Sequence, residues 1–121
     1  MHPIVLWVAE GNRLVLIQVA LLACVIAPFI EETMFRGFLQ RYLRDASQWA
    51  GFTVSFLFSM IFNSLIFAAI HPQGPLAIPV LTAIACGLSI LREWRGSLWA
   101  PMVAHGLNNS IVMSILFGAV W

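Results

Sequence analysis

The fold is decided by residues 14–36, which read LVLIQVALLACVIAPFIEETMFR. The first part, residues 14–30, carries no charged side chain and approaches the roughly 20 residues that a helix needs to cross a bilayer. It ends at Glu31 and Glu32, and Arg36 follows four residues after Glu32. Ionised groups next to hydrocarbon are costly unless they are paired or face water. The charged residues at the end of this apolar segment therefore predict either an interfacial cap or a functional site.

The composition indicates a membrane protein. Hydrophobic residues make up 61% of the 121 residues and charged residues only 9%, whereas about a quarter of the residues in a soluble domain are charged. A net charge of +1 gives no reason to expect a nucleic-acid partner. Cys24 and Cys86 both lie in apolar runs, so no disulfide framework is expected. We predict an integral membrane protein, and the small loops and the absence of lysine favour the bacterial plasma membrane.

Hydropathy predicts an all-α, polytopic transmembrane helical bundle with about four membrane helices. The expected spans are residues 14–30, 52–70, 76–91 and 98–121. Residues 1–13 are interpreted as a lead-in, and residues 14–121 as a single membrane-embedded core. Apolar residues at steps of three and four between residues 35 and 43 extend the first helix as an amphipathic stretch towards Asp45.

The arginines predict an orientation. Successive crossings place most of them on one side of the membrane, namely Arg41, Arg44, Arg92 and Arg95. The opposite side carries Arg13 and the turn His-Pro-Gln-Gly-Pro at residues 71–75. By the positive-inside rule, the arginine-rich side is cytoplasmic.

Helical spacing separates the two glutamates. Glu32 and Arg36 are four residues apart, so they share a helix face and can form an ion pair. Glu31 is rotated by about 100° from that face and remains available as a general base. The simpler alternative is that both acids bind Arg36 and do nothing else.

Polar residues also interrupt two later spans. A stripe repeats every four residues along the second span: Ser55, Ser59, Asn63, Phe67 and His71. Such a stripe faces protein or water, and hydrogen bonding between helices explains its first three residues equally well. In the last span His105 and Asn109 are four apart, with Asn108 beside them. Together with Glu31, these groups provide an acid, two imidazoles and an amide.

At these residues the chain resembles the CPBP intramembrane endopeptidases, which include type II CAAX prenyl proteases and bacterial Abi proteins. The family motifs are Glu-Glu-x-x-x-Arg, Phe-x-x-x-His and His-x-x-x-Asn or Asp. They occur here in the same order, as Glu31 to Arg36, Phe67 to His71 and His105 to Asn109. Members of the family generally have more transmembrane helices, so we expect a trimmed or minimal catalytic core.

The resemblance implies a peptide hydrolase that uses a glutamate and no cofactor. Glu31 and His71 are expected to activate a water molecule, and His105 and Asn109 to donate hydrogen bonds to the oxyanion. The expected supporting residues are Glu32, Arg36, Phe67 and Asn108. In the alternative, zinc-dependent version, Glu31, His71 and His105 bind the metal. Asn109 has a role in the first version but is not a usual zinc ligand.

Other function classes stay open. A non-catalytic bacteriocin-immunity or binding membrane protein could keep the same residues as a ligand site. A transporter is disfavoured because no inverted repeat is visible. The expected partners are membrane lipid and a peptide or lipidated protein substrate, but the motifs do not specify the substrate or the oligomeric state.

One geometric prediction is demanding. Glu31, His71 and His105 should meet in one cavity, although hydropathy alone puts His71 at the far end of its span and His105 about 12 Å from the arginine-rich side. Helix tilt, or continuation of the first helix to residue 44, must close this gap.

Overall fold

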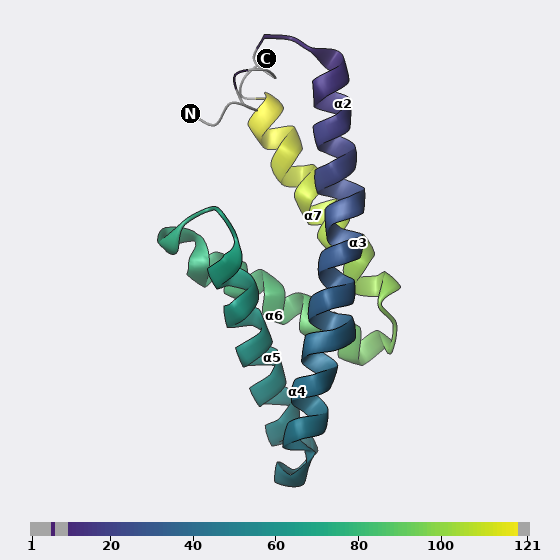
Figure 1. Ribbon diagram of the computed structural model, residues 1–121, viewed down its shortest axis with the longest axis vertical. Helices are drawn as coiled ribbons and strands as arrows, with labels where there is room; N and C mark the ends of the chain where they lie inside the picture. The colour runs from purple at the N-terminus through teal and green to yellow at the C-terminus, as the bar shows by residue number, and fades with distance from the viewer. Residues whose placement is uncertain (1–5, 7–9, 119–121) are drawn as a thin grey trace.

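The computed structural model describes residue 6 and residues 10–118, and every element in them is helical. One continuous helix of 38 residues, Arg13–Ala50, runs the length of the molecule (Figure 1). Asn12 caps its start by accepting hydrogen bonds from the backbone N–H groups of Leu14 and Val15. At about 1.5 Å per residue this helix is far longer than the roughly 30 Å of bilayer hydrocarbon.

The long helix is not uniform. It contains two π-helical segments, each of which adds a residue to a turn and changes the direction of the following side chains. Its successive parts are α2 (Arg13–Leu21), the π-helical η1 (Leu22–Ile26), α3 (Ala27–Glu32), the π-helical η2 (Thr33–Leu39), α4 (Gln40–Ser47) and the 3-10 turn η3 (Gln48–Ala50). The two glutamates therefore lie on α3, between the π-helical segments.

Three further helices follow the long helix, and the first and last of them pack on it. They are α5 (Phe52–Ile70), α6 (Ile78–Arg95), which the short η4 (Pro75–Ala77) precedes, and α7 (Trp99–Gly118). Helix α5 runs back along the half of the long helix that contains α4, with α6 against α5 (Figure 1). Helix α7 crosses to the other half and contacts η1 and α3 (Figure 1). This topology confirms the predicted all-α bundle and the predicted continuation of the first helix.

Of the helices in the described residues, three are long and apolar enough to span a membrane: Arg13–Ala50, Phe52–Ile70 and Pro75–Arg95. The fourth predicted span forms α7 but is not among them. Its polar residues His105, Asn108 and Asn109 lower its hydropathy. The last residues of that predicted span, 119–121, and most of the predicted lead-in lie outside the described residues.

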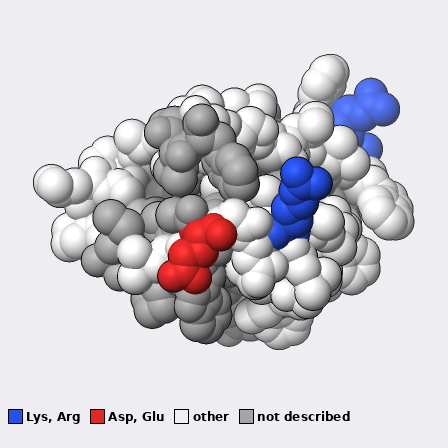
Figure 2. Space-filling view, turned by 90° about the horizontal axis from the view of Figure 1, so that it is seen from above, with Lys and Arg blue, Asp and Glu red and all other residues white. Residues whose placement is uncertain are grey.

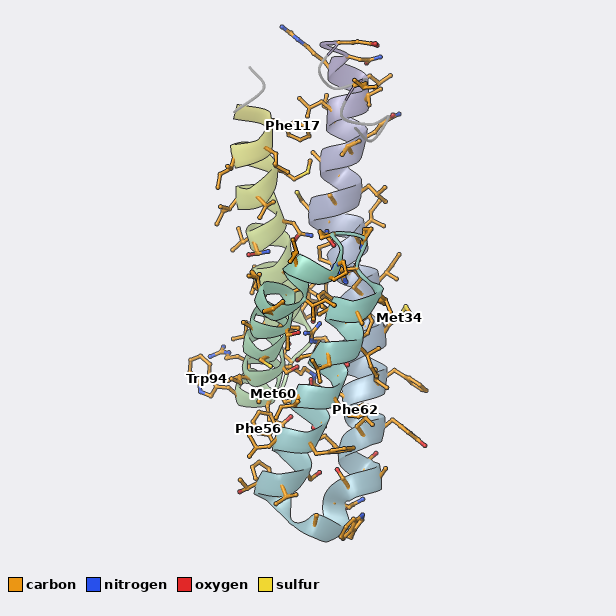
Figure 3. The ribbon with its side chains drawn as sticks, turned by 90° about the vertical axis from the view of Figure 1, so that its left-hand side faces the viewer. Met34, Phe56, Met60, Phe62, Trp94 and Phe117 are labelled. Atoms are coloured by element: carbon orange, nitrogen blue, oxygen red, sulfur yellow. The ribbon has the colours of Figure 1, made fainter. Side chains whose placement is uncertain are left out.

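The outer faces of the helices are apolar. Met34, Phe62 and Trp94 are 58%, 50% and 77% exposed and mark three places on this surface (Figure 3). Charged side chains are sparse on the end of the molecule seen in Figure 2. A surface of this kind suits hydrocarbon and not water. The chain is an integral membrane protein.

The interior is more polar than the exterior. The buried polar and charged residues include Glu32, Arg36, Gln40, Ser55, Ser59, Asn63, Ser64, Ser89 and His105. They surround a small apolar cluster of Phe35, Phe67 and Ala85. The predicted stripe on the second span faces this interior, where Ser55 contacts Ser47 and the backbone carbonyl of Arg44.

The length of the first helix sets the level of His71. Gly51 turns the chain with φ +89°, a backbone conformation that favours glycine. Helix α5 then has 19 residues, close to the number that separates Glu31 from the end of the long helix. Its last turn therefore returns to the level of Glu31, which resolves the difference in depth that hydropathy alone implies.

An ion pair joins the two arginine-bearing stretches. Arg44 Nη2 is 2.6 Å from Glu93 Oε1, so α4 and the end of α6 are joined by an ion pair. That these arginines lie on one side of the membrane, and that this side is cytoplasmic, stay predictions.

Candidate active site

Glu31 is the point where three helices meet. Its Oε2 lies 3.6 Å from Nε2 of His71 and 3.6 Å from Nε2 of His105. The Glu31 side chain is 30% exposed and that of His71 is 15% exposed, so neither group is fully buried. The predicted convergence of Glu31, His71 and His105 is confirmed by these distances, while a cavity at this point stays a prediction.

His71 is oriented by the end of its own helix. The following Pro72 disfavours helical geometry, and His71 adopts extended backbone with φ −74° and ψ 140°. Its Nδ1 lies 2.6 Å from the carbonyl oxygen of Phe67. A carbonyl can only accept a hydrogen bond, so Nδ1 carries the proton. In the neutral form of the ring, Nε2 is the unprotonated nitrogen, and it faces Glu31.

His105 bridges the two glutamates. Its Nδ1 lies 2.7 Å from Oε1 of Glu32, and its Nε2 faces Glu31. The Glu32 carboxylate accepts the Nδ1 proton, so that in the neutral form of the ring Nε2 is the unprotonated nitrogen. The sequence did not predict this bond, because it joins residues 73 positions apart.

Glu32 also holds Arg36, as predicted. Nη1 of Arg36 is 3.1 Å from Oε1 of Glu32, and neither side chain is exposed. Nη2 of Arg36 donates to the carbonyl oxygen of Ala85 on α6 at 2.7 Å. Because Glu31 instead faces the two histidines, the alternative in which both acids bind only Arg36 is wrong.

Phe67 forms the wall between the catalytic candidates. Its ring lies 4.1 Å from the His71 ring and 5.8 Å from the His105 ring, measured between centroids. Its ring centroid lies 4.8 Å from Cζ of Arg36, within the range of a cation–π contact. Phe35 packs edge-on against it at 5.1 Å. Phe67 thus supports both histidines and the arginine at once.

Asn109 is placed differently from the three groups that converge. Its Nδ2 donates to the carbonyl oxygen of Ala23 in η1 at 2.8 Å. Asn108 contacts the side chain of Asn109 through a long hydrogen bond of 3.5 Å. The predicted donation from Asn109 to an oxyanion stays a prediction.

A family model matches the part of the chain that contains this site. The family model described as type II CAAX prenyl endopeptidase Rce1-like matches residues 13–111, which include the whole of the site. The chain belongs to this Rce1-like family. The resemblance that the three motifs carry is therefore confirmed.

Curated relatives of this Rce1-like chain are bacterial. The chain is 34% identical over 86 residues to the uncharacterized protein YpbD of Bacillus subtilis, an alignment that covers 69% of this chain and 38% of that protein. It is 28% identical over 96 residues to an uncharacterized 24.3 kDa protein of Escherichia coli, covering 78% of this chain and 41% of that protein. The chain thus matches about two fifths of the length of these relatives. No solved structure matches it.

Sequence reasoning missed several backbone groups of this Rce1-like site. The carbonyl of Ala85 left no signal in the sequence, because any residue presents a carbonyl. Gly106 was visible beside His105, but its contact with the long helix was not. Pro28 was also visible, and it accounts for the free carbonyls in η1, as described below.

Metal binding was the open alternative. In the described part of the chain, no three His, Cys, Asp or Glu side chains are placed to hold a metal ion. The two Nε2 atoms do face the same carboxylate oxygen, and both rings are anchored through Nδ1 as metal-binding histidines usually are. Zinc binding therefore stays open as the alternative to a shared proton or water.

Proposed function

We propose that this chain is the catalytic core of a peptide hydrolase that cleaves a membrane-associated peptide or lipidated protein, with Glu31 as the general base. The observation that carries the proposal is the approach of both Nε2 atoms to Glu31 Oε2 at 3.6 Å. Three acceptor groups that face one another need a proton or a polarised water between them. Membership of the Rce1-like family supports the same reaction class.

The charges of the cluster support one added proton. Glu31 and Glu32 are balanced only in part by Arg36, so one negative charge remains while both rings are neutral. A buried cluster is most stable when its charges balance. A proton on Nε2 of His105 achieves this, since Glu32 already accepts the Nδ1 proton of the same ring. His105 then presents a charged N–H to the site while Glu31 stays ionised.

The proposed reaction follows from this state. Glu31 takes a proton from a water molecule that also donates to Nε2 of His71, and the water oxygen forms a bond to the scissile carbonyl carbon. The N–H of His105 donates to the developing oxyanion, a contribution of about 3 kcal/mol for one such donor. When the carbon–nitrogen bond breaks, Glu31 returns its proton to the leaving amine. Asn109 has one remaining amide hydrogen for the oxyanion, because the other is bound by Ala23.

The test uses the full chain in detergent or vesicles with a prenylated C-terminal peptide and its unprenylated counterpart. Glu31→Gln keeps the size of the side chain and removes the base, so cleavage should fall at least about 100-fold. Glu10→Gln, in an exposed turn, is the matched control and should retain activity. Equal cleavage by the wild type and Glu31→Gln would overturn the proposal. A wild type that cleaves neither peptide but confers a phenotype that survives Glu31→Gln would favour the immunity or binding alternative.

A further inference from the structure

Pro28 leaves two backbone carbonyls of η1 without their usual partners. In a regular helix the carbonyls of Ala23 and Cys24 accept from the residues four positions later. The N–H of Ala27 donates instead to Leu22, five positions back. Pro28 has no N–H to donate to Cys24. Both carbonyls are therefore available to a neighbouring helix, at a depth where an unpaired carbonyl is costly.

Helix α7 approaches both of these carbonyls. Nδ2 of Asn109 donates to Ala23 O at 2.8 Å. One turn earlier, a Cβ added to Gly106 would lie 2.5 Å from Cys24 O, a separation that real side chains do not tolerate. Glycine is thus the residue that lets α7 come this close. Gly106 is also adjacent in sequence to His105, which faces both glutamates.

We propose that Asn109 and Gly106 are positioning residues, which dock α7 on the carbonyls freed by Pro28 and thereby fix His105 against Glu32 and Glu31. In this arrangement Asn109 affects catalysis through the position of His105, and its second amide hydrogen stays available to the oxyanion. Helix α7 contacts η1, α3 and the preceding α6, so the contacts at Ala23 and Cys24 are central to how it is held. The consequence for catalysis rests on the proposed function, but the docking itself does not.

The test follows the Nδ1 proton of His105 by NMR in the full, detergent-solubilised chain labelled with ¹⁵N-histidine. A short hydrogen bond to a carboxylate should give this proton a strongly downfield resonance. Asn109→Ala and Gly106→Ala should each abolish or broaden that resonance while circular dichroism shows retained helix. Gly87→Ala on α6 is the control, because a Cβ there meets nothing within 4 Å. It should leave the resonance unchanged.

Activity provides the second readout. If His105 is displaced by about 1 Å, cleavage should fall about 100-fold in both variants. An Asn109→Ala protein that keeps the His105 resonance and wild-type melting temperature but loses cleavage would overturn the proposal and make Asn109 a direct oxyanion donor. If the wild type cleaves nothing, the proposed function fails, whereas the resonance still decides whether Asn109 and Gly106 position His105.

Pro28→Ala completes the design. Ala27 donates five positions back, to Leu22, and in the same register an N–H restored at position 28 donates to Ala23. Ala23 then depends less on Asn109. Asn109→Ala should therefore lower the melting temperature less in the Pro28→Ala protein than in the wild type. Equal shifts in both backgrounds would contradict coupling through Ala23 and would overturn this account of Asn109.

Discussion

His105 and Glu32 are joined by a 2.7 Å bond between Nδ1 and Oε1, although they lie on different helices. Oε1 of Glu32 is also the atom that binds Arg36, at 3.1 Å. A single carboxylate oxygen therefore ties the arginine of the long helix to the histidine of α7. Because Glu32 and Arg36 are fully buried, loss of one partner leaves the other without compensation from water.

The first prediction concerns Arg36. Arg36→Ala leaves Glu32 as a buried acid with only His105 to balance it, and breaking a buried pair from one side costs about 3–5 kcal/mol. The variant should unfold at a markedly lower denaturant concentration in detergent and lose cleavage. The measurement is an equilibrium unfolding curve monitored by circular dichroism.

The double variant Glu32→Leu with Arg36→Leu is the control for charge. It removes both ions and leaves no buried charge in this pair, so it should be more stable than Arg36→Ala while remaining inactive. If the double variant instead lost the sum of the costs of Arg36→Leu and Glu32→Leu, the two charges would not be coupled, and mutual neutralisation would not explain their burial.

The sequence predicts the contacts that follow from helical periodicity. The Glu32–Arg36 pair is a four-residue spacing on one helix, and the interior position of Ser55, Ser59 and Asn63 is a four-residue stripe on another. The boundaries of α5 also agree with the predicted span, residues 52–70. Each of these depends on local geometry, which hydropathy and spacing report directly.

Contacts between helices are not encoded in this way. The approach of His71 and His105 to Glu31 depends on the length of the long helix and on the turn at Gly51. Only the resemblance of the ordered motifs pointed to it. The contact between Asn109 and Ala23 joins residues 86 positions apart. This contact depends on the π-helical segment next to Pro28. The spacing of residues in the sequence does not reveal that segment.

The second prediction concerns Phe67. This ring is 2% exposed and contacts both histidines and Arg36. Phe67→Ala should cost about 3–5 kcal/mol of unfolding free energy through the cavity that it leaves, and cleavage should fall with it. Phe58→Ala on the same helix removes a ring that is 43% exposed and should cost only about 0.5 kcal/mol. Equal losses in the two unfolding curves would contradict a specific role for Phe67.

The third prediction concerns Gly51, which turns the chain from the long helix into α5. Its φ of +89° and ψ of 163° are accessible essentially to glycine alone. A Cβ there would meet nothing within 4 Å, so the cost of Gly51→Ala is backbone strain of about 1–3 kcal/mol. Gly87→Ala, in the middle of α6, should instead be neutral or stabilising. Thermal unfolding of both variants checks this, and an unaffected Gly51→Ala protein would show that the turn can be made without glycine.

The last prediction separates water activation from zinc chemistry. In the proposed mechanism the two Nε2 atoms share a proton and a water with Glu31, and no metal takes part. Strong chelators should therefore leave cleavage of the test peptide within about 2-fold of the untreated protein. Loss of the base, by comparison, should lower cleavage roughly 100-fold. Metal analysis of the active protein should find less than stoichiometric zinc. The rings are already anchored by Phe67 O and Glu32, so a zinc enzyme would show the opposite: activity lost with the chelator and restored by zinc. In that case Glu31 would be a ligand, and Glu31→Gln would lower zinc content together with activity, an effect that loss of a base alone does not produce.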